Sequence, residues 1–273
     1  DMRDVVEVNR AGTIVRQVTG FNIPRDARSL SYDRWLVTDG GDGRVYELDP
    51  NTGQVIWAVS GLPNASAAKR LPNGNTLIVE NGVPPRVIEV TPSRTIVWSY
   101  TLGFLCVADS CSGYPTDAER LPNGNTLIAI ADSTQGVMEV NPSGTIVWQY
   151  TGIIAYSATR LSNGYILMTD SRVTGGGARI ASPTGELAWN YAFGDAGAPA
   201  LNLPRDAQSM PDGNVLVADY GKNRVVEIDP TTNTIVWQWD SANSSPYSAV
   251  RALPLMTIRT HVPLATTRYE GAW

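Results

Sequence analysis

A short phrase that ends in tryptophan recurs along the chain and limits its fold more than any other feature. The phrases are GQVIW, RTIVW, GTIVW, GELAW and NTIVW, which end at Trp57, Trp98, Trp148, Trp189 and Trp237, and GTIVR, which ends at Arg16. In chain order their ends are 41, 41, 50, 41 and 48 residues apart, and the count from Trp237 through the C-terminus and on from residue 1 to Arg16 is 52. A period that continues across the chain ends indicates a closed ring of repeats.

Each repeat contains four strand-like segments. Within residues 111–150, TDAERL and NTLIAIA flank a turn at residues 122–124, and GVMEV and TIVWQY flank a second turn at residues 141–144. Asn and Gly in these turns tolerate positive φ, and Pro fixes the φ of the first corner. Val, Ile, Thr, Trp and Tyr fill the segments between, as strands prefer, and no segment keeps a helical period. We therefore predict an all-β fold, a six-bladed β-propeller with four antiparallel strands per blade.

The ring is predicted to be a single domain over residues 1–273. Its blades are predicted at residues 21–57, 61–98, 102–148, 152–189, 193–237, and 241–262 together with 1–18. In this last, composite blade, residues 245–254 and 256–262 would form the inner strands and residues 5–18 the outer pair. N- and C-terminal strands would thus share one blade and close the ring. Residues 263–273 leave the repeat, and they are predicted either to be a loose end or to dock on a blade or a second copy.

The recurring tryptophan is predicted to have a structural role. It stands near the end of the outermost strand, where its ring can pack against the next blade and bury apolar surface. Arg16 takes its place in the composite blade, and the sequence pattern offers no reason for the exchange.

Three phrases resemble the repeats of known propeller families. RLPNGNTLI, which occurs at 70–78 and again at 120–128, followed by EVNPSGTIVWQY, resembles the repeats of bacterial arylsulfotransferase-type propellers. ELDPNTGQVIW is similar to the tryptophan-docking repeat of quinoprotein propellers, and GNVLVADYGKNRVVEIDP at 213–230 resembles an NHL repeat. The resemblance implies a propeller over nearly the whole chain. It carries no activity, because function on such scaffolds resides in individual sites.

The residues that these families use for chemistry are not matched. Arylsulfotransferases use a channel histidine, whereas the single histidine here, His261, lies outside any repeat motif. Quinoprotein dehydrogenases have adjacent cysteines, but four residues separate Cys106 from Cys111. NHL-type lyases hold metals with histidine clusters, which one histidine cannot form. These departures favour a protein without catalytic activity, and a channel enzyme that resembles arylsulfotransferases or NHL-type lyases is the alternative.

Polar residues at equivalent positions of the innermost strands form the candidate site. Four residues before the Leu of each RLP-like phrase, or before the Met that replaces it in the fifth blade, stand Asp26, Ala67, Asp117, Ser157 and Asp206, and Ser248 follows with a one-residue slip. The residues just before these are Arg25, Ser66, Thr116, Tyr156, Arg205 and Tyr247. Innermost strands line the axis of a propeller. We therefore predict that one mouth of the channel is a ligand-binding site formed by Arg25, Asp26, Asp117, Tyr156, Arg205, Asp206 and Tyr247.

Two insertions are predicted on the same face. FLCVADSCSG at 104–113 and FGDAGAPALN at 193–202 lead into the inner strands of the third and fifth blades. Loops on a rigid scaffold commonly carry binding residues, so the predicted partner is a protein, a small molecule or a glycan.

A competing interpretation gives Asp26, Asp117 and Asp206 a structural role, as acceptors for backbone N–H groups and partners of arginines. No cofactor is predicted. Ca²⁺ is left open, although three carboxylates fall short of its usual six to eight oxygen ligands.

Composition limits the classes of partner and the cellular locations that fit this protein. The net charge of −5 and the lack of a Lys/Arg run argue against a nucleic-acid partner. No stretch approaches the roughly 20 apolar residues of a membrane span. A local disulfide between Cys106 and Cys111 is predicted, which would require an oxidising compartment. The start at Asp1 fits a processed chain or a fragment. We therefore predict a secreted or periplasmic protein.

The favoured function is an extracytoplasmic module that recognises a ligand or protein partner through the face that carries the insertions. A third alternative is a structural subunit that self-assembles through residues 263–273 or through exposed blade edges. These alternatives make different predictions for the channel mouth, the tail and the outer strands.

Overall fold

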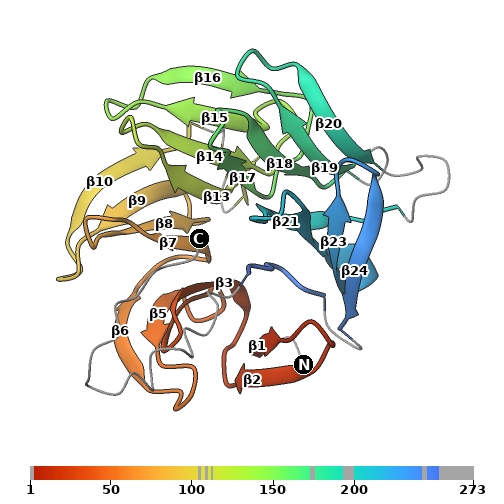
Figure 1. Ribbon diagram of the computed structural model, residues 1–273. Coiled ribbons are helices and arrows are strands. Elements are labelled where there is room, and N and C mark those ends of the chain that lie inside the picture. The colour runs from red at the N-terminus through yellow and green to blue at the C-terminus, as the bar shows by residue number, and fades with distance from the viewer. Residues whose placement is uncertain are drawn as a thin grey trace, which may run out of the picture.

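Five sheets of four antiparallel strands surround a common centre in this computed structural model (Figure 1). It describes residues 3–103, 106–107, 110–111, 113–172, 176–192, 200–241 and 245–251, with the backbone alone at residues 106, 107, 110, 111 and 192. Strands follow one another within each sheet from the channel outward, which confirms the all-β propeller with four strands per blade. Within the described residues no helix is long and apolar enough to cross a membrane.

The strand bounds follow the repeat. The first two blades are β3 (Pro24–Ser31), β4 (Arg34–Asp39), β5 (Arg44–Leu48) and β6 (Val55–Ser60), then β7 (Ala65–Arg70), β8 (Thr76–Glu80), β9 (Arg86–Val90) and β10 (Ile96–Thr101). The third and fourth are β13 (Pro115–Arg120), β14 (Thr126–Ile130), β15 (Val137–Val140) and β16 (Ile146–Tyr150), then β17 (Ala158–Arg160), β18 (Ile166–Asp170), β19 (Gly177–Ala181) and β20 (Leu187–Ala192). The fifth is β21 (Pro204–Ser209), β22 (Val215–Asp219), β23 (Arg224–Asp229) and β24 (Thr234–Asp240), with the short helix η1 (Tyr220–Lys222) between β22 and β23.

The prediction of six four-stranded blades is wrong for the described residues. In the sixth sector, between the first and fifth blades, lies a two-stranded sheet of β1 (Val5–Val8) and β2 (Ile14–Val18). These are the two outer strands expected of the composite blade. Of the predicted inner strands, residues 252–262 lie outside the described part of the chain, as do His261 and the tail 263–273.

Residues 245–251 lie along the channel without joining a sheet, because side chains rather than a neighbouring strand bind their polar groups. The N–H of Ala249 donates to Asp206 Oδ2 over 3.3 Å, and the N–H of Arg251 donates to Gln208 Oε1 over 2.6 Å. Pro246 has no N–H to donate to a ladder. The segment is therefore held in the channel by the fifth blade, and it carries Tyr247 and Ser248 to the position that the sequence repeat predicted.

The duplicated nine residues form the same hairpin in both copies. Gly74 and Gly124 adopt φ of 85° and 87°, a conformation that favours glycine. In each copy the N–H of the Leu donates across the turn to the carbonyl of the second Asn over 2.8 Å, Leu71 to Asn75 and Leu121 to Asn125. The second Asn side chain then donates to a glutamate of the third strand over 2.6 Å, Glu89 or Glu139. The copied phrase thus connects the first three strands of a blade.

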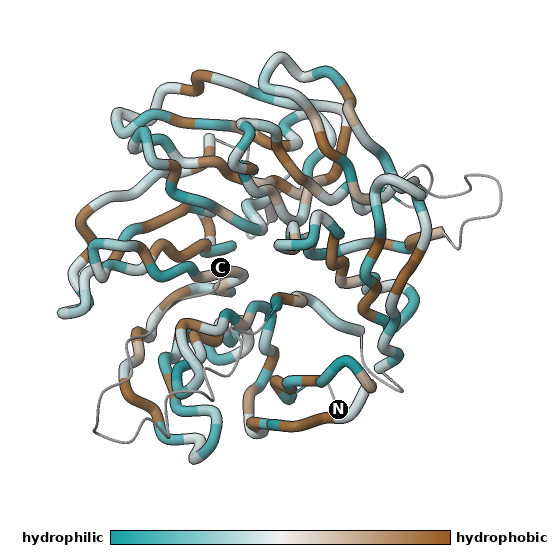
Figure 2. The backbone as a smooth tube through the Cα atoms, in the orientation of Figure 1, coloured by the Kyte–Doolittle hydropathy of each residue, from teal (hydrophilic) through white to brown (hydrophobic). Residues whose placement is uncertain are grey.

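The hydrophobic core lies between neighbouring blades. One cluster joins Val79 and Val87 of the second blade to Ile128 and Met138 of the third. The second strand of each blade is covered on both faces, so all five residues of β8, β14, β18 and β22 are buried. In Figure 2 hydrophobic residues run along the strands of every blade, and many turns are hydrophilic. Each fully buried Val or Ile contributes about 1.5–3 kcal/mol.

A set of polar contacts fixes how one blade is aligned against the next. In the third strand of the second blade, Glu89 lies directly across the ladder from Trp98. Arg120, from the inner strand of the third blade, binds Glu89 over 2.9 Å, and its guanidinium carbon lies 4.4 Å from the centre of the Trp98 ring. Trp98 Nε1 donates to the carbonyl of Pro142, also in the third blade, over 3.1 Å. We name this Arg–Glu–Trp arrangement the interblade lock. It confirms the predicted packing of tryptophan against the next blade.

The interblade lock recurs at two further junctions. Between the first and second blades it consists of Glu47, Trp57 and Arg70, with the Trp57 Nε1 bonded to the carbonyl of Pro92 over 2.8 Å. Between the third and fourth blades it consists of Glu139, Trp148 and Arg160, with Trp148 Nε1 bonded to the carbonyl of Pro183 over 2.8 Å. The repeated geometry sets each blade in the same register against the next.

Arg16 has a structural explanation in the same terms. It lies across the ladder from Glu7, as the tryptophans lie across from their glutamates, and its guanidinium binds Glu7. The guanidinium also contacts the rings of Tyr32 and Trp35 in the first blade, at 4.5 and 5.3 Å. At the position where the second, third and fourth blades have the arginine of an interblade lock, the first blade has Ser29. Arg16 on the outer strand β2 therefore supplies the cation that the inner strand supplies in those locks.

The junction between the fourth and fifth blades has no such lock. Ile180 replaces the glutamate across from Trp189, and Ser209 replaces the arginine. Trp189 Nε1 is buried and has no hydrogen-bond acceptor among the described residues. Apolar contacts between Leu167, Tyr191 and Val217 hold this junction instead.

Replacing Arg120 tests the interblade lock. We expect Arg120→Met to lower the free energy of unfolding by about 1–3 kcal/mol, because Glu89 keeps its charge in a mostly buried place and loses its cation. Urea denaturation followed by tryptophan fluorescence measures the change. Ser209→Met, at the equivalent exposed position of the junction without a lock, is the matched control and should stay within about 0.5 kcal/mol of the parent. Equal effects of the two substitutions would contradict the role of the lock.

Candidate functional site

The seven residues predicted to bind a ligand line one cavity at the mouth of the channel. The cavity encloses about 380 Å³, a volume within the usual range of small-molecule sites. The other lining residues are Arg28, Asn64, Ser66, Ala67, Asn81, Gly82, Val83, Pro85, Tyr114, Thr116, Ser157 and Ser248. The structure thus brings the seven predicted residues together. That these residues bind a ligand stays a prediction. Most of the two insertions lies outside the described residues, but Tyr114, which follows the first, lines the cavity.

A β-bulge opens the inner strand of four blades and explains why adjacent residues face the same cavity. In β3, Pro24 pairs with Asp39 and Asp26 with Thr38, so Arg25 has no partner of its own in β4. The ladders of β7, β13 and β21 shift in the same way, at Ser66, Thr116 and Arg205. Side chains alternate between faces in a regular strand, and a bulge changes this alternation. Arg25 and Asp26 therefore both reach the cavity.

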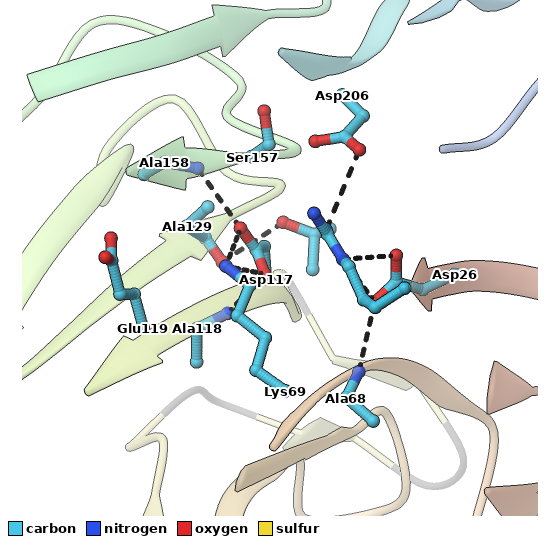
Figure 3. A network of polar contacts seen from close by, with 12 residues as sticks. Asp26, Ala68, Lys69, Asp117, Ala118, Glu119, Ala129, Ser157, Ala158 and Asp206 are labelled. Carbon is cyan, nitrogen blue, oxygen red and sulfur yellow. Dashed lines mark hydrogen bonds and ion pairs between the residues drawn. The ribbon is translucent and has the colours of Figure 1, made fainter. Parts of the chain in front are cut away.

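The three predicted aspartates are buried and join neighbouring blades (Figure 3). Asp26 Oδ2 accepts the N–H of Ala68 in the second blade over 3.3 Å. Asp117 Oδ2 accepts the N–H of Ala158 in the fourth blade over 3.5 Å. Asp206 accepts the N–H of Ala249 in the sixth sector. Each aspartate therefore acts as the structural acceptor that the competing interpretation predicted.

Basic side chains neutralise these aspartates from inside the channel. Arg28 lies 2.9 Å from Asp26 and 3.7 Å from Asp206, and Lys69 Nζ lies 2.8 Å from Asp117. Ser248 Oγ lies 2.9 Å from Asp26 Oδ1 and 2.9 Å from Asp206 Oδ2, so its one proton can be donated to either carboxylate, and the contact joins the last segment of the ring to its first blade. The region between the carboxylates is thus occupied by Arg28 and Lys69. Among the described residues no group of three or more His, Cys, Asp or Glu is arranged to hold a metal ion.

Burial changes the protonation of this inner layer. Burial raises the pKa of Asp206, and Arg28 only partly offsets it because Asp26 and Asp117 add further negative charge. Burial by itself lowers the pKa of Arg28, but Asp26, Asp206 and Asp117 together outweigh it, so the pKa of Arg28 is raised. Arg28 therefore stays charged, and Asp206 is more easily protonated than an ordinary carboxylate.

The mouth itself is formed by tyrosines and two arginines. The guanidinium carbon of Arg205 lies 3.6, 4.8 and 5.3 Å from the ring centres of Tyr156, Tyr220 and Tyr247. Tyr114 and Tyr156 share a hydrogen bond of 2.7 Å between their hydroxyl groups. Neither Arg25 nor Arg205 has a hydrogen-bond or ion-pair partner within the described residues, and Arg25 Nε and Arg205 Nε and Nη1 are buried. The cavity is therefore lined by two guanidinium groups whose donors have no acceptor among the described residues.

Sequence reasoning missed Arg28, Lys69, Tyr114 and Tyr220. Arg28 and Lys69 stand two residues after the Asp26 and Ala67 positions, and strand alternation could have placed them in the channel. Tyr114 and Tyr220 lie outside the inner strands, at the end of an insertion and in η1, where the repeat gives no signal. Cys106 and Cys111 pair directly in the backbone of the hairpin β11 (Cys106–Val107) and β12 (Ser110–Cys111), and their disulfide stays a prediction.

One family matches most of these blades. The PQQ_2 family, described as outer membrane protein assembly factor BamB, matches residues 41–254. The chain belongs to the PQQ_2 family. This confirms the resemblance to quinoprotein-like repeats, whereas the resemblance to arylsulfotransferases finds no support in the comparisons. Among curated proteins, none matches the chain.

Solved structures resemble this PQQ_2 propeller at low sequence identity. A protein of unknown function from Bacteroides caccae is 15% identical with a TM-score of 0.73, over 89% of this chain and 93% of that one. A Kuenenia stuttgartiensis hydrazine synthase chain is 15% identical with a TM-score of 0.65, over 90% and 84%. Virginiamycin B lyase from Staphylococcus aureus is 15% identical with a TM-score of 0.56, over 87% and 73%. These similarities establish the fold alone.

The pKa of Asp206 gives a prediction for stability against pH. A carboxyl whose pKa is higher in the folded state stabilises the fold while it is protonated, and this contribution is lost as pH rises from the unfolded value of about 3.9 through the folded pKa. Asp206→Asn resembles the protonated form at every pH. We therefore expect the parent to lose stability relative to this variant as the pH is raised from about 3.5 to 7, in urea denaturation at each pH.

Asp212→Asn is the control for this experiment. Asp212 is exposed and occupies the turn position at which the duplicated phrase has Asn73 and Asn123. The difference in unfolding free energy between parent and Asp212→Asn should change little over the same pH range. A parent that gains stability relative to Asp206→Asn as pH rises would contradict the assigned direction.

Proposed function

We propose that this PQQ_2 propeller is a binding module that recognises a small molecule or an exposed group of a partner through the channel-mouth cavity, without catalysis. The observation that carries the proposal is a pair of guanidinium groups, those of Arg25 and Arg205, which line the cavity and have no hydrogen-bond or ion-pair partner among the described residues. Buried donors are usually bonded, and unpaired ones cost about 1–3 kcal/mol each. A ligand that supplies acceptors would recover this cost.

The carboxylates of the cavity favour binding over catalysis. Asp26, Asp117 and Asp206 each accept a hydrogen bond from a backbone N–H and contact a basic side chain or a serine hydroxyl, so much of their acceptor capacity is used within the protein. General-base catalysis needs a group within hydrogen-bond distance of the substrate proton and with a free acceptor. An enzyme that resembles NHL-type lyases is therefore the weaker proposal, and the similarity to virginiamycin B lyase supports only the scaffold.

A second candidate function is protein assembly through blade edges. The description of the family as an outer membrane protein assembly factor supports it. The outermost strands also expose pairs of β-branched residues, such as Ile96 and Val97 at 47% and 54% and Ile146 and Val147 at 46% and 51%. Exposed strand edges can accept a further strand from another chain. The same family description and the facing backbone of Cys106 and Cys111 support the proposed extracytoplasmic location.

A pocket-filling variant tests the proposed function. Ser66 stands on a bulge of β7 and lines the cavity, so Ser66→Trp should fill much of its volume. The probes are a defined panel of neutral, acidic and amino mono- and disaccharides, screened by thermal shift and titrated by calorimetry. We expect at least one compound that binds the parent and not Ser66→Trp, and no new compound in the NMR spectrum after incubation.

Val147→Trp is the control, because it adds the same ring to an exposed outer strand away from the cavity. It should bind as the parent does. Far-UV circular dichroism and urea denaturation check that both variants fold. If no compound loses binding in Ser66→Trp, or if a compound is chemically converted, the proposed function is wrong. A dimer or larger species of the parent in light scattering that Val147→Trp alters would instead support assembly through the blade edges.

A further inference from the structure

The two arginines at the channel mouth differ from the other cations of the channel. Arg28 and Lys69 have carboxylate partners, and Arg16, Arg70, Arg120 and Arg160 are held by glutamates of the interblade locks or of the terminal sheet. Arg25 and Arg205 have no carboxylate or carbonyl partner in the described part of the chain. Because arginine stays protonated at any pH a protein meets, both carry an uncompensated charge.

The backbone holds these two arginines in place. Each stands on the bulge of its inner strand, Arg25 in β3 and Arg205 in β21, so its direction is set before any ligand arrives. Arg25 also packs against Gly40: a Cβ at position 40 would lie 2.8 Å from Arg25 Nε and 2.6 Å from the carbonyl oxygen of Ala65. Glycine is therefore required at position 40, and it leaves room for the Arg25 side chain at the rim of the cavity. Such preorganisation lowers the entropy cost of binding.

Three tyrosine rings surround Arg205 without using its hydrogen-bonding capacity. A ring contacts the face of a guanidinium, whereas the N–H groups point outward in its plane. Tyr156, Tyr220 and Tyr247 thus desolvate the cation and leave Nε and Nη1 without acceptors. In a site shielded from water, a charge-assisted hydrogen bond is about twice as strong as a neutral one. The arrangement favours an acceptor with negative charge.

Tyrosine hydroxyls complete the donor set. Tyr114 lines the cavity and shares its hydroxyl hydrogen bond with Tyr156. Burial raises the pKa of Tyr114, although Arg205 and Arg25 oppose the shift, so the hydroxyl stays protonated and can donate. The opposing effect of both arginines also places their charges near this hydroxyl. The mouth therefore combines two cations and neutral hydroxyl donors.

We propose that Arg25 and Arg205 bind an oxyanion, a carboxylate or phosphate group carried by a small organic ligand, in the channel-mouth cavity. The inference rests on the proposed function, since it names the ligand class of the same cavity. The planar fork of arginine matches the two oxygens of a carboxylate or phosphate. Arg28 and Lys69 offset two of the three negative charges of the aspartates in the layer below, which reduces their repulsion of the ligand.

Three hexoses that differ in charge test the inference. Glucose, glucuronate and glucose 6-phosphate are titrated by calorimetry into the parent, Arg25→Met, Arg205→Met and the double variant, at one ionic strength set with sodium chloride. We expect one or both anionic hexoses to bind the parent at least about 10-fold more tightly than glucose, and each single substitution to reduce that affinity about 10-fold. The glucuronate and glucose 6-phosphate arms show whether a carboxylate or a phosphate is preferred.

Arg94→Met is the matched control, because it removes an exposed arginine from the turn between β9 and β10, at the opposite end of the strands from the cavity. It should bind the anionic hexoses as the parent does. Equal affinity for glucose and the anionic hexoses, or unchanged anion affinity in the double variant, would overturn the inference. Binding of glucose alone, sensitive to Ser66→Trp, would overturn the oxyanion and leave the proposed function standing. Binding of none of the three would overturn the oxyanion inference, and the saccharide panel would still decide the proposed function.

Discussion

At three junctions the register between neighbouring blades is fixed by a guanidinium placed between a glutamate and a tryptophan ring. Apolar contact between two sheets is not directional, so by itself it would allow one blade to slide along the next. The interblade lock removes this freedom, because Arg120 must meet Glu89 and Trp98 at one position while Trp98 reaches the carbonyl of Pro142. The inner strands, and with them the channel-mouth cavity, are therefore held at fixed positions.

In the channel the aspartates make structural contacts, and we propose that the arginines just before two of them bind the ligand. Asp26, Asp117 and Asp206 connect the first, third and fifth blades to the segment that follows each of them through backbone N–H groups, and Arg28 and Lys69 offset part of their charge. Of the residues just before these aspartates, Arg25 and Arg205 stand on bulges and have no hydrogen-bond or ion-pair partner among the described residues. Thr116 differs, because its hydroxyl bonds the carbonyl of Ala155, just before the fourth blade, over 3.0 Å. The positions of Arg25 and Arg205 are therefore the ones left for the proposed binding.

Much of this arrangement could be predicted from the sequence, because turns and tryptophans repeat at a fixed period. Strand number per blade, the hairpin of the duplicated phrase and the place of the aspartates all follow from that period. The sixth sector could not be predicted, since Asp206 and Gln208 bind the backbone N–H groups of residues 245–251 with their side chains. The β-bulges also escape a sequence reading, because a bulge adds one residue without a compositional signal. Tyr114 and Tyr220 lie outside the period altogether.

Each interblade lock takes its glutamate and tryptophan from one blade and its arginine and proline carbonyl from the next. A blade therefore carries the glutamate and tryptophan of one lock on one side, and the arginine and proline carbonyl of another lock on the other side. When such a unit is duplicated in tandem, the new copy fits both of its neighbours at once, with no compensating change required. The two identical copies of RLPNGNTLI at 70–78 and 120–128 are what this permits. Arg16, which takes the place of both a missing arginine and a missing tryptophan, lies in the two-stranded sheet of β1 and β2, where the described residues do not complete a four-stranded blade.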